Sequence, residues 1–371
     1  MPSHHENHFA YPPLTPLPAG FRPSWARDRA VILRQAEPDW IPLLEVGLDR
    51  THKARVLGRP VRSLEDEIAV ALRVGQPFVV LSLGLHNSPA VQAAMATTEV
   101  TVDPDLMEWA HGMERKWAHG TQGAIRSEAD FESFPWPNPD RLDMNILDQA
   151  DRLLPADFKV IFAVGKVFNL AWWLMGFDVF SYALVDQPAL VERLYDRIAA
   201  FQSRVVERAL EHPSVGLIWH ADDIAYKTGL MVSPAVLRRH VFPVYKRLNH
   251  ECHLKDIPCV YHSDGNVESV IEDIIGAGFD AFNPIEPGAM DIYALKPKVA
   301  GRLTLIGNVD LHYTLTRGTP AEVEAEVRQL IERLAPGGGY ALASANSVPD
   351  YVPWPNWVAM HGAWLKYGKQ K

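Results

Sequence analysis

The chain has 371 residues, of which 47% are hydrophobic and 22% are charged, a composition typical of a globular protein with a large buried core. Its formal net charge is −9 and it contains no Lys/Arg-rich block, which argues against nonspecific binding of nucleic acid. Two cysteines are too few for a disulfide framework, and no apolar stretch reaches the length of a membrane span, so we expect a cytoplasmic protein.

The first 24 residues are rich in proline and histidine and lack a basic segment followed by an apolar run. A secretion signal needs both features, so we interpret residues 1–24 as an arm before the folded part of the chain. Residues 25–371 are expected to form a single domain.

Short apolar runs that end in polar residues recur along the chain, and helical stretches separate them. Six clear runs cover residues 159–166, 216–223, 258–265, 280–287, 303–310 and 340–347, and two looser ones cover 41–47 and 78–86. The helical stretch after the run 303–310 contains Thr319, Pro320 and Glu322, a capping-box pattern. Strands that alternate with helices predict a parallel sheet, and eight such units predict a (β/α)8 barrel.

A barrel also explains why nearly every run ends in Asp, His, Asn or Glu, because the carboxyl ends of its strands meet at one mouth. A doubly wound open sheet is the alternative, and it explains the alternation but not the polar ends. Residues 100–155 fit the repeat poorly, and the stretch "ESFPWPNPDRLD" within them is rich in proline and aromatic residues. We expect an insertion there that covers the mouth as a lid.

The stretch "VYHSDG" places His262 and Asp264 two residues apart at the end of a predicted strand. Side chains two apart in a strand point the same way, so both are expected to face the mouth. Asp222 and Asp223 end the preceding strand and point in opposite directions, so at most one of them faces the mouth directly. A simple ion pair between His262 and Asp264 is the structural alternative.

Other polar and aromatic residues near the strand ends are candidates for proton transfer or substrate binding. We expect catalytic roles for Asp222, Asp223, Tyr226, Asn308 and Asn346, and substrate contacts from His220, Lys227, Trp172, Glu286 and Asp310. Structural roles are the alternatives: Asn308 can bridge neighbouring strands, and Trp172 can belong to the core. Glu45 is surrounded by apolar residues and needs a partner, whether a ligand or an arginine.

Several long stretches resemble the uroporphyrinogen decarboxylase superfamily, from about residue 25 to the end of the chain. They are "SEADFESFPWPNPDRLD", "GKVFNLAWWLMGFDVFSYALVDQPALVERL", "DDIAYKTGLMVSP", "YHSDGNVESVIEDIIGAGFDAFNPIEP", "LIGNVD" and "GGGYALASANSVP". The resemblance implies a (β/α)8 barrel with its site in the mouth. It also implies one of two chemistries, which are metal-free decarboxylation of uroporphyrinogen and methyl transfer to or from a corrinoid protein, usually with zinc.

Two signatures of the decarboxylases are broken in this chain. Those enzymes carry a Met-Arg-Gln-Ala-Gly-Arg-Tyr element whose arginines bind substrate carboxylates, and the nearest text here is "LRQAEPDW". It keeps Arg34 but has Glu37 in place of glycine and lacks the second arginine. The decarboxylases also carry a histidine near the last strand, where this chain has Asn346.

The corrinoid methyltransferases that act on thiols use a His-x-Cys pair and a further cysteine. Here His262-x-Asp264 and Asn346 occupy those positions, so the spacing is kept without the sulfur. A site of oxygen and nitrogen ligands suits a Lewis acid acting on an oxygen better than one activating a thiol. The resemblance then implies zinc held by His262, Asp264 and either Asp222 or Asp223, with His220 and Asn346 as outer groups.

We therefore expect the chain to transfer a methyl group to a corrinoid from a small methoxylated compound, such as an aromatic one, or from another methylated compound. No Asp-x-His-x-x-Gly stretch for binding a corrinoid occurs in the sequence, so the corrinoid is expected on a separate partner protein. The family implies a homodimer. A metal-free decarboxylase and a ligand-binding protein without catalysis are the alternatives.

Overall fold

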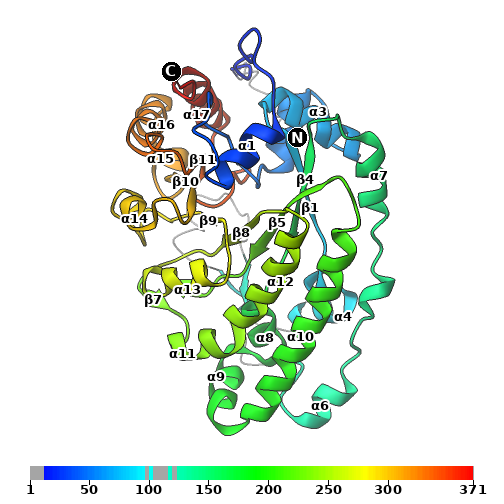
Figure 1. Ribbon diagram of the computed structural model, residues 1–371. Helices are drawn as coiled ribbons and strands as arrows, with labels where there is room; N and C mark the ends of the chain where they lie inside the picture. Colours follow the sequence, from blue (N-terminus) through cyan, green and yellow to red (C-terminus); the bar gives the residue numbers. More distant parts are fainter. Residues whose placement is uncertain (1–11, 97–99, 103–115, 119–122, 371) are drawn as a thin grey trace, which may run out of the picture.

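The computed structural model describes residues 12–96, 100–102, 116–118 and 123–370 (Figure 1). Its main feature is a seven-stranded parallel sheet in the order β1-β4-β5-β8-β9-β10-β11. The strands are β1 (Phe78–Ser82), β4 (Lys159–Val164), β5 (Val215–Ala221), β8 (Cys259–His262), β9 (Ala281–Asn283), β10 (Thr304–Val309) and β11 (Tyr340–Ser344). Seven of the eight predicted units therefore contain a strand of the sheet, and these strands follow one another in sequence order, as the barrel requires.

The eighth position of the barrel is filled by the extended segment 41–47, which the sequence also predicted. The backbone N–H of Leu44 donates to Leu342 O at 2.8 Å, and the N–H of Leu342 donates to Pro42 O at 2.9 Å, so the segment lies beside β11. On its other side, Gln76 Nε2 donates to the carbonyl oxygens of Leu43 and Glu45 just before β1 begins. The predicted (β/α)8 fold is confirmed, with one side-chain amide joining the segment to the residues before β1.

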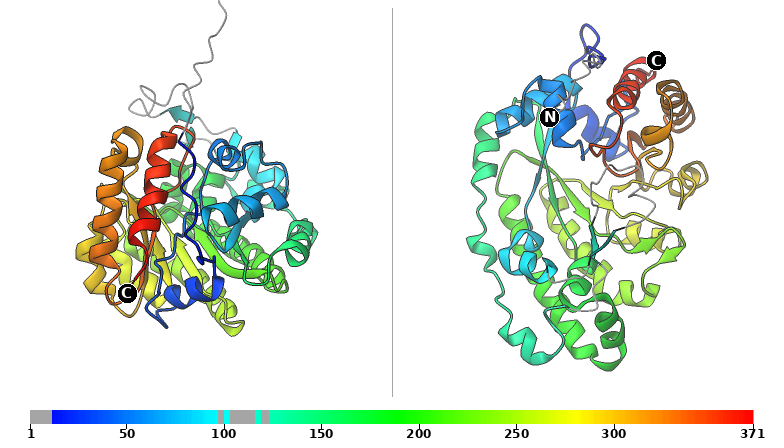
Figure 2. Two further views of the ribbon diagram at one scale, coloured as in Figure 1. Left: turned by 90° about the horizontal axis from the view of Figure 1, so that it is seen from above. Right: turned by 180° about the vertical axis from the view of Figure 1, so that it is seen from behind.

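Helices cover the outside of the strands, as the view from above shows (Figure 2). Before β4 they are α1 (Trp25–Ile32), α2 (Arg50–Leu57), α3 (Leu64–Val74), α4 (Pro89–Ala96), α6 (Glu128–Ser133) and α7 (Asn145–Leu153). After it come α8 (Phe168–Met175), α9 (Phe177–Asp186), α10 (Pro188–Ala209), α11 (Pro234–Val236), α12 (Phe242–Leu254), α13 (Ile271–Gly276), α14 (Ile292–Val299), α15 (Thr314–Arg317), α16 (Pro320–Leu334) and α17 (Trp354–Tyr367). The predicted capping box at Thr319 and Glu322 begins α16. In the described residues no single helix is long and apolar enough to span a membrane, although the bent pair α8–α9 passes that test by length and composition.

The insertion after β1 is described only in part. Its β2 (Val100–Val102) and β3 (Lys116–Ala118) pair antiparallel, and α6 and α7 follow. Residues 103–115 and 119–122 of the predicted lid, and residues 1–11 of the predicted arm, lie outside the described residues. The covering role of the insertion therefore stays a prediction.

The interior of the barrel holds a separate cluster of apolar side chains, and this cluster shows which face of each strand points inward. Its members include Leu217 and Trp219 of β5, with Ala221 packed against them, and Val260 of β8. Because strand side chains alternate, odd-numbered residues of β5 and even-numbered residues of β8 face the interior. Trp25 and Ile32 of α1 join the same cluster, so α1 covers the amino-terminal end of the barrel.

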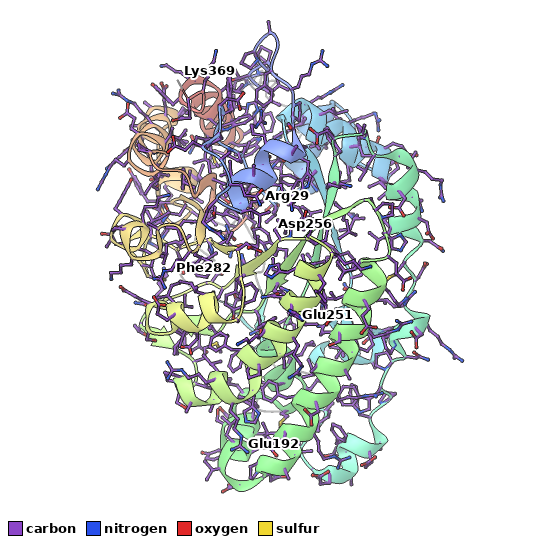
Figure 3. All side chains as sticks on the ribbon, in the orientation of Figure 1. Arg29, Glu192, Glu251, Asp256, Phe282 and Lys369 are labelled. Carbon is purple, nitrogen blue, oxygen red and sulfur yellow. The ribbon has the colours of Figure 1, made fainter. Side chains whose placement is uncertain are left out.

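An ion pair fixes this covering helix to the loop before β8. Arg29 Nη2 lies 2.5 Å from Asp256 Oδ1, and Figure 3 shows the two residues together above the sheet, with Phe282 of β9 below them. With its amino-terminal end covered by α1, the barrel places its candidate site at the carboxyl ends of the strands.

Candidate active site

Three predicted site residues come together at the carboxyl ends of β5 and β8. His262 Nε2 lies 4.0 Å from Asp223 Oδ1 and 3.7 Å from Asp264 Oδ1. One ligand atom from each residue can be chosen so that all three lie within 4.8 Å of one another. The side chains are partly exposed, at 36% for Asp223, 14% for His262 and 23% for Asp264. The prediction that the histidine and aspartate of "HSD" face the same way is confirmed.

The orientation of His262 is set by a residue that the sequence analysis did not select. Its Nδ1 lies 2.6 Å from Asn283 Oδ1, while Asn283 Nδ2 donates to Ile306 O at 3.0 Å. Since the amide nitrogen is used on β10, the amide oxygen faces the histidine and can only accept, so Nδ1 carries a proton. In the neutral ring Nε2 then presents its lone pair to the two carboxylates, which is the tautomer a metal ligand needs.

The two carboxylates are also held in place by hydrogen bonds. Asn346 Nδ2 donates to Asp264 Oδ2 at 2.7 Å, and the backbone N–H of Asp264 donates to Asp223 Oδ1 at 2.9 Å. Asn169 of α8 bonds the backbone of Asp223 in both directions, at 2.8 and 3.0 Å. The expected place of Asn346 beside the metal ligands is consistent with this contact. The cluster is therefore oriented before any ligand binds.

Asp222 does not reach this cluster. Its side chain points outward and accepts the backbone N–H groups of Val167, Phe168 and Asn169, at 2.8–3.1 Å, and the hydroxyl of Tyr245 at 2.7 Å. These contacts hold the beginning of α8. Burial raises the pKa of Asp222 to about 6, although the same hydrogen bonds act in the opposite direction. The structure thus gives Asp223, rather than Asp222, the inward position that the sequence left open.

His220 also lies outside the mouth, where the sequence analysis expected a substrate contact. Its fully buried ring packs against Tyr245 and Phe279 at 5.0 and 5.6 Å between centroids. Neither ring nitrogen has a hydrogen-bond partner within 3.5 Å among the described residues, and Asn249 is near enough only for a weak contact. Burial lowers the pKa of His220 to about 3, so it is a neutral residue of the outer layer.

The remaining predicted residues fall into a rim group and a structural group. Tyr226 is 50% exposed in the two-residue strand β6 (Ala225–Tyr226), which pairs with β7 (Gly229–Leu230) at the rim. Lys227 Nζ lies 3.4 Å from Glu286 Oε1, and Glu286 Oε2 accepts the N–H of Gly265. These three residues remain candidates for contact with a substrate that enters from the rim.

The structural group comprises Asn308, Asp310, Trp172 and Glu45. Asn308 Nδ2 donates to Ile285 O at 2.6 Å, and Asp310 accepts the N–H groups of the turn that follows it. Trp172 is 9% exposed, and Glu45 accepts the N–H groups of Ser344 and Gly47 rather than an arginine. These contacts agree with the structural alternatives, in which Asn308 bridges neighbouring strands and Trp172 belongs to the core.

One residue at the end of a neighbouring strand, Lys166, was missed as a site residue. Lys166 follows β4 with a left-handed φ of 65°, its Nζ donates to Ala221 O at 3.4 Å, and it lies 5.0 Å from the ring centroid of Trp173. A long side chain held in this strained backbone region at a strand end is typical of a functional position. The ending "GK" after the apolar run was the only available signal.

Arg34, the remnant of the decarboxylase element, is at the other end of the barrel. Its Nη1 donates to Ile32 O at 2.8 Å and lies 3.4 Å from Thr304 Oγ1 at the start of β10. It therefore cannot bind a substrate in the mouth. A second group with metal-ligand spacing, Asp148, Asp151 and His212, lies outside the barrel, and His212 Nδ1 already bonds Asp151 at 2.8 Å.

The parallel barrel and the polar cluster at its carboxyl ends define a (β/α)8 protein of the enzyme type. A family model described as "Uroporphyrinogen decarboxylase (URO-D)" matches residues 79–366, so the chain belongs to the uroporphyrinogen decarboxylase family. A uroporphyrinogen decarboxylase of Azotobacter vinelandii is 24% identical over 282 residues, covering 72% of this chain and 76% of the relative. The solved structure of a methyltransferase from Methanosarcina mazei shares the fold with a TM-score of 0.70 and 19% identity, covering 93% of this chain and 99% of that one.

Proposed function

We propose that this enzyme transfers a methyl group from a small methoxylated or otherwise methylated compound to a corrinoid carried by a separate protein. The observation that carries the proposal is the cluster of Asp223, His262 and Asp264, in which one ligand atom from each residue lies within 4.8 Å of the others and Asn283 turns His262 Nε2 toward the two carboxylates. One nitrogen and two oxygen ligands suit zinc and leave a fourth position for a substrate oxygen. When bound there, the metal supplies Lewis-acid polarisation of that oxygen.

The residues of the chain perform the positioning that this reaction needs. Asn283 keeps His262 Nε2 turned to the cluster, and Asn346 holds Asp264 by its second oxygen. As the methyl group passes to the corrinoid, the carbon–oxygen bond breaks and the bonding pair stays on the oxygen, which then takes a proton. Tyr226, half-exposed at the rim, is the described hydroxyl we assign to that proton, and Lys166 and Trp173 border the substrate on the β4 side.

Decarboxylation of a porphyrinogen is the second candidate, and the similarity to the Azotobacter vinelandii enzyme favours it. A substrate with many carboxylates requires clustered cations. Among the described residues, the inward-facing positions at the ends of β5, β8, β9 and β10 carry Asp223, His262, Asn283 and Asn308, with no arginine. This distribution of charge favours methyl transfer.

Metal content gives the first test. Protein purified without a His-tag or chelator is expected to contain about one zinc per chain, and the double variant His262→Ala, Asp264→Ala to contain none. Asp222→Asn is the matched control, because that carboxylate lies next to the cluster in sequence but points away from it. The absence of metal from the parent protein would leave His262 and Asp264 with hydrogen-bonding or acid–base roles and favour decarboxylation.

Activity gives the second test. The protein is incubated with reduced corrinoid proteins encoded near it and with a panel of small methoxylated compounds, and methylation of cobalt is followed by absorbance. We expect methylation with at least one compound and its loss in the double variant. A metal-loaded protein that binds compounds tightly but never methylates a corrinoid would instead be a binding protein.

A further inference from the structure

A polar cavity lies at the end of the barrel opposite the mouth. Its volume is about 410 Å³, and it is bordered by Arg34, Tyr293, Lys296, Arg333 and the glycine loop 337–339. The loop leads directly into β11, and Arg34 contacts Thr304 at the start of β10. The cavity is therefore built on the amino ends of these strands, between the carboxyl ends of α14 and α16.

The charge of this cavity contrasts with that of the chain. Three cationic side chains and no carboxylate of the described residues line it, although the protein carries a net charge of −9. The acids near its border are Glu37, whose Cγ would lie 3.7 Å from a Cβ on Gly338, and Asp280 beside Arg34. The side chains of Lys296 and Arg34 both reach Gly339, where an added Cβ would lie 3.5 Å from Lys296 Nζ and 3.7 Å from Arg34 Cγ. Such a concentration of positive charge needs a counter-charge.

Lys296 finds no carboxylate there. Its Nζ donates to the carbonyl oxygens of Gly338 and Gly339, which leaves the third N–H of the ammonium for another acceptor. Burial lowers the pKa of Lys296 to about 8, and no nearby anion offsets the effect. The side chain is thus held at the cavity by neutral groups alone.

Arg34 has only a long contact with an acid. Its Nη2 lies 3.8 Å from Asp280 Oδ1, while Asp280 Oδ2 is taken by His253 at 2.9 Å and by the N–H of Cys259 at 2.9 Å. The left-handed φ of 57° at Arg34 is a strained conformation for a long side chain. The fold therefore holds a partly buried arginine next to Lys296 although the one nearby carboxylate is mostly engaged elsewhere.

Arg333 completes the cation group. Its guanidinium lies 3.6 Å from the centroid of the Tyr293 ring, which fixes the plane of its donors. The carboxyl ends of α14 and α16 explain one cation each, because helix dipoles favour positive charge there. Arg34 is held by the carbonyl oxygens of Ile32 and Asp280, and neither these bonds nor the helix dipoles account for the cavity that the three cations border.

We propose that this cavity binds a small, multiply charged phosphate compound. A guanidinium fork of fixed orientation and a compact ammonium are the two groups that proteins combine on phosphate oxygens. The cavity volume falls within the range of small-molecule sites. The proposal does not depend on the reaction in the mouth, which lies at the other end of the strands.

Calorimetric titration of the full chain with sodium pyrophosphate tests the proposal, in about 0.15 M salt so that weak surface attraction is screened. We expect saturable binding that weakens about tenfold to hundredfold in Arg333→Ala and in Lys296→Met. Arg328→Ala is the matched control, because Arg328 is exposed on the same helix and pairs with Glu332 at 2.7 Å. Its affinity should equal that of the parent.

Three results would overturn the proposal. The first is no saturable binding to the parent protein, and the second is equal binding by the parent and both cavity variants. The third is binding of citrate as tight as that of pyrophosphate, which would make the cavity a general polyanion site. Arg333 is exposed, so Arg333→Ala should fold. The test therefore stays decisive even if Lys296→Met does not fold.

Discussion

Two adjacent aspartates at the carboxyl end of β5, Asp222 and Asp223, lie on opposite sides of the strand and have different roles. On the outer side, Asp222 is fully buried and its oxygens bond backbone groups of α8 and the hydroxyl of Tyr245. On the inner side, Asp223 is 36% exposed and faces His262 across 4.0 Å. The comparison teaches that residue type alone does not identify a site residue. An aspartate on the outer face stabilises the fold, whereas an aspartate on the inner face can bind a ligand.

The same division separates the two histidines of these strands. His220 packs among aromatic rings in the outer layer, and burial keeps it neutral by lowering its pKa to about 3. His262 lies at the mouth with one nitrogen bonded to Asn283 and the other turned to two acids. On the outer face of these strands the polar residues therefore pack against aromatic rings or bond a helix end, and on the inner face they are placed to hold a metal.

The largest expected effect comes from replacing each of the two aspartates by alanine and comparing the two variants. Asp222→Ala leaves the backbone N–H groups of Phe168 and Asn169 and the hydroxyl of Tyr245 buried without an acceptor, so we expect a loss of about 3–5 kcal/mol in unfolding free energy. Asp223→Ala should lose metal while its stability without metal changes by less than about 1 kcal/mol. Urea unfolding in the presence of chelator, together with metal analysis, measures both quantities.

The comparison would fail if the two variants behaved alike. Loss of metal from folded Asp222→Ala protein would mean that the outer carboxylate supports the cluster through β5. A large loss of stability in Asp223→Ala would mean that the inner carboxylate is also part of the fold.

The sequence was sufficient for the fold and for part of the site. The repeat of apolar runs with polar ends predicted the barrel, and the spacing of His262 and Asp264 predicted that they face the same way. It could not decide between Asp222 and Asp223, because β5 is buried on both faces and its letters "VGLIWHA" carry no polar–apolar alternation. Asp222 shares the strand parity of His220, and the inward position of Trp219 places both of those side chains on the outer face of β5.

The residues that were missed depend on contacts between strands. Asn283 acts on His262 through the register of β8 with β9, which pairs His262 with Asn283 directly. No spacing along one strand reveals such a pair. Arg34 gave a misleading signal, because its neighbours "RQA" matched a family element while the fold places them at the amino end of the barrel.

An intermediate effect is expected from acid. The pKa of His220 is about 3 in the folded protein and about 6.5 when unfolded, so the neutral ring stabilises the fold above pH 6.5 and this contribution is lost as the pH falls toward 3. Between pH 6.5 and pH 4 the loss amounts to about 3 kcal/mol. Unfolding free energies measured by urea across this range should therefore decrease, and His220→Phe should remove this share of the slope.

The variant also tests whether the outer position is structural. His220→Phe keeps a ring beside Tyr245 and Phe279 and removes only the weak contact of the imidazole with Asn249, so its stability at pH 7 should stay within about 1 kcal/mol of the parent. His312→Asn, at an exposed position, is the control and should keep the full slope. An unchanged slope in His220→Phe would show that the acid sensitivity arises elsewhere.

The smallest expected effect concerns the residue that orients the inner histidine. Asn283→Ala removes the acceptor of His262 Nδ1, and loss of such an outer contact weakens metal binding by about tenfold to hundredfold, or about 1.4–2.7 kcal/mol. Competition with a zinc indicator measures the change. Asn283→Asp keeps an acceptor and should restore most of the affinity.

Asn308→Ala removes a buried amide from the neighbouring strand that bonds Ile285 rather than His262, so it should leave zinc affinity unchanged. An equal loss in Asn283→Ala and Asn308→Ala would mean that the mouth needs rigid strand ends in general and that the bond to His262 has no special part in holding the metal.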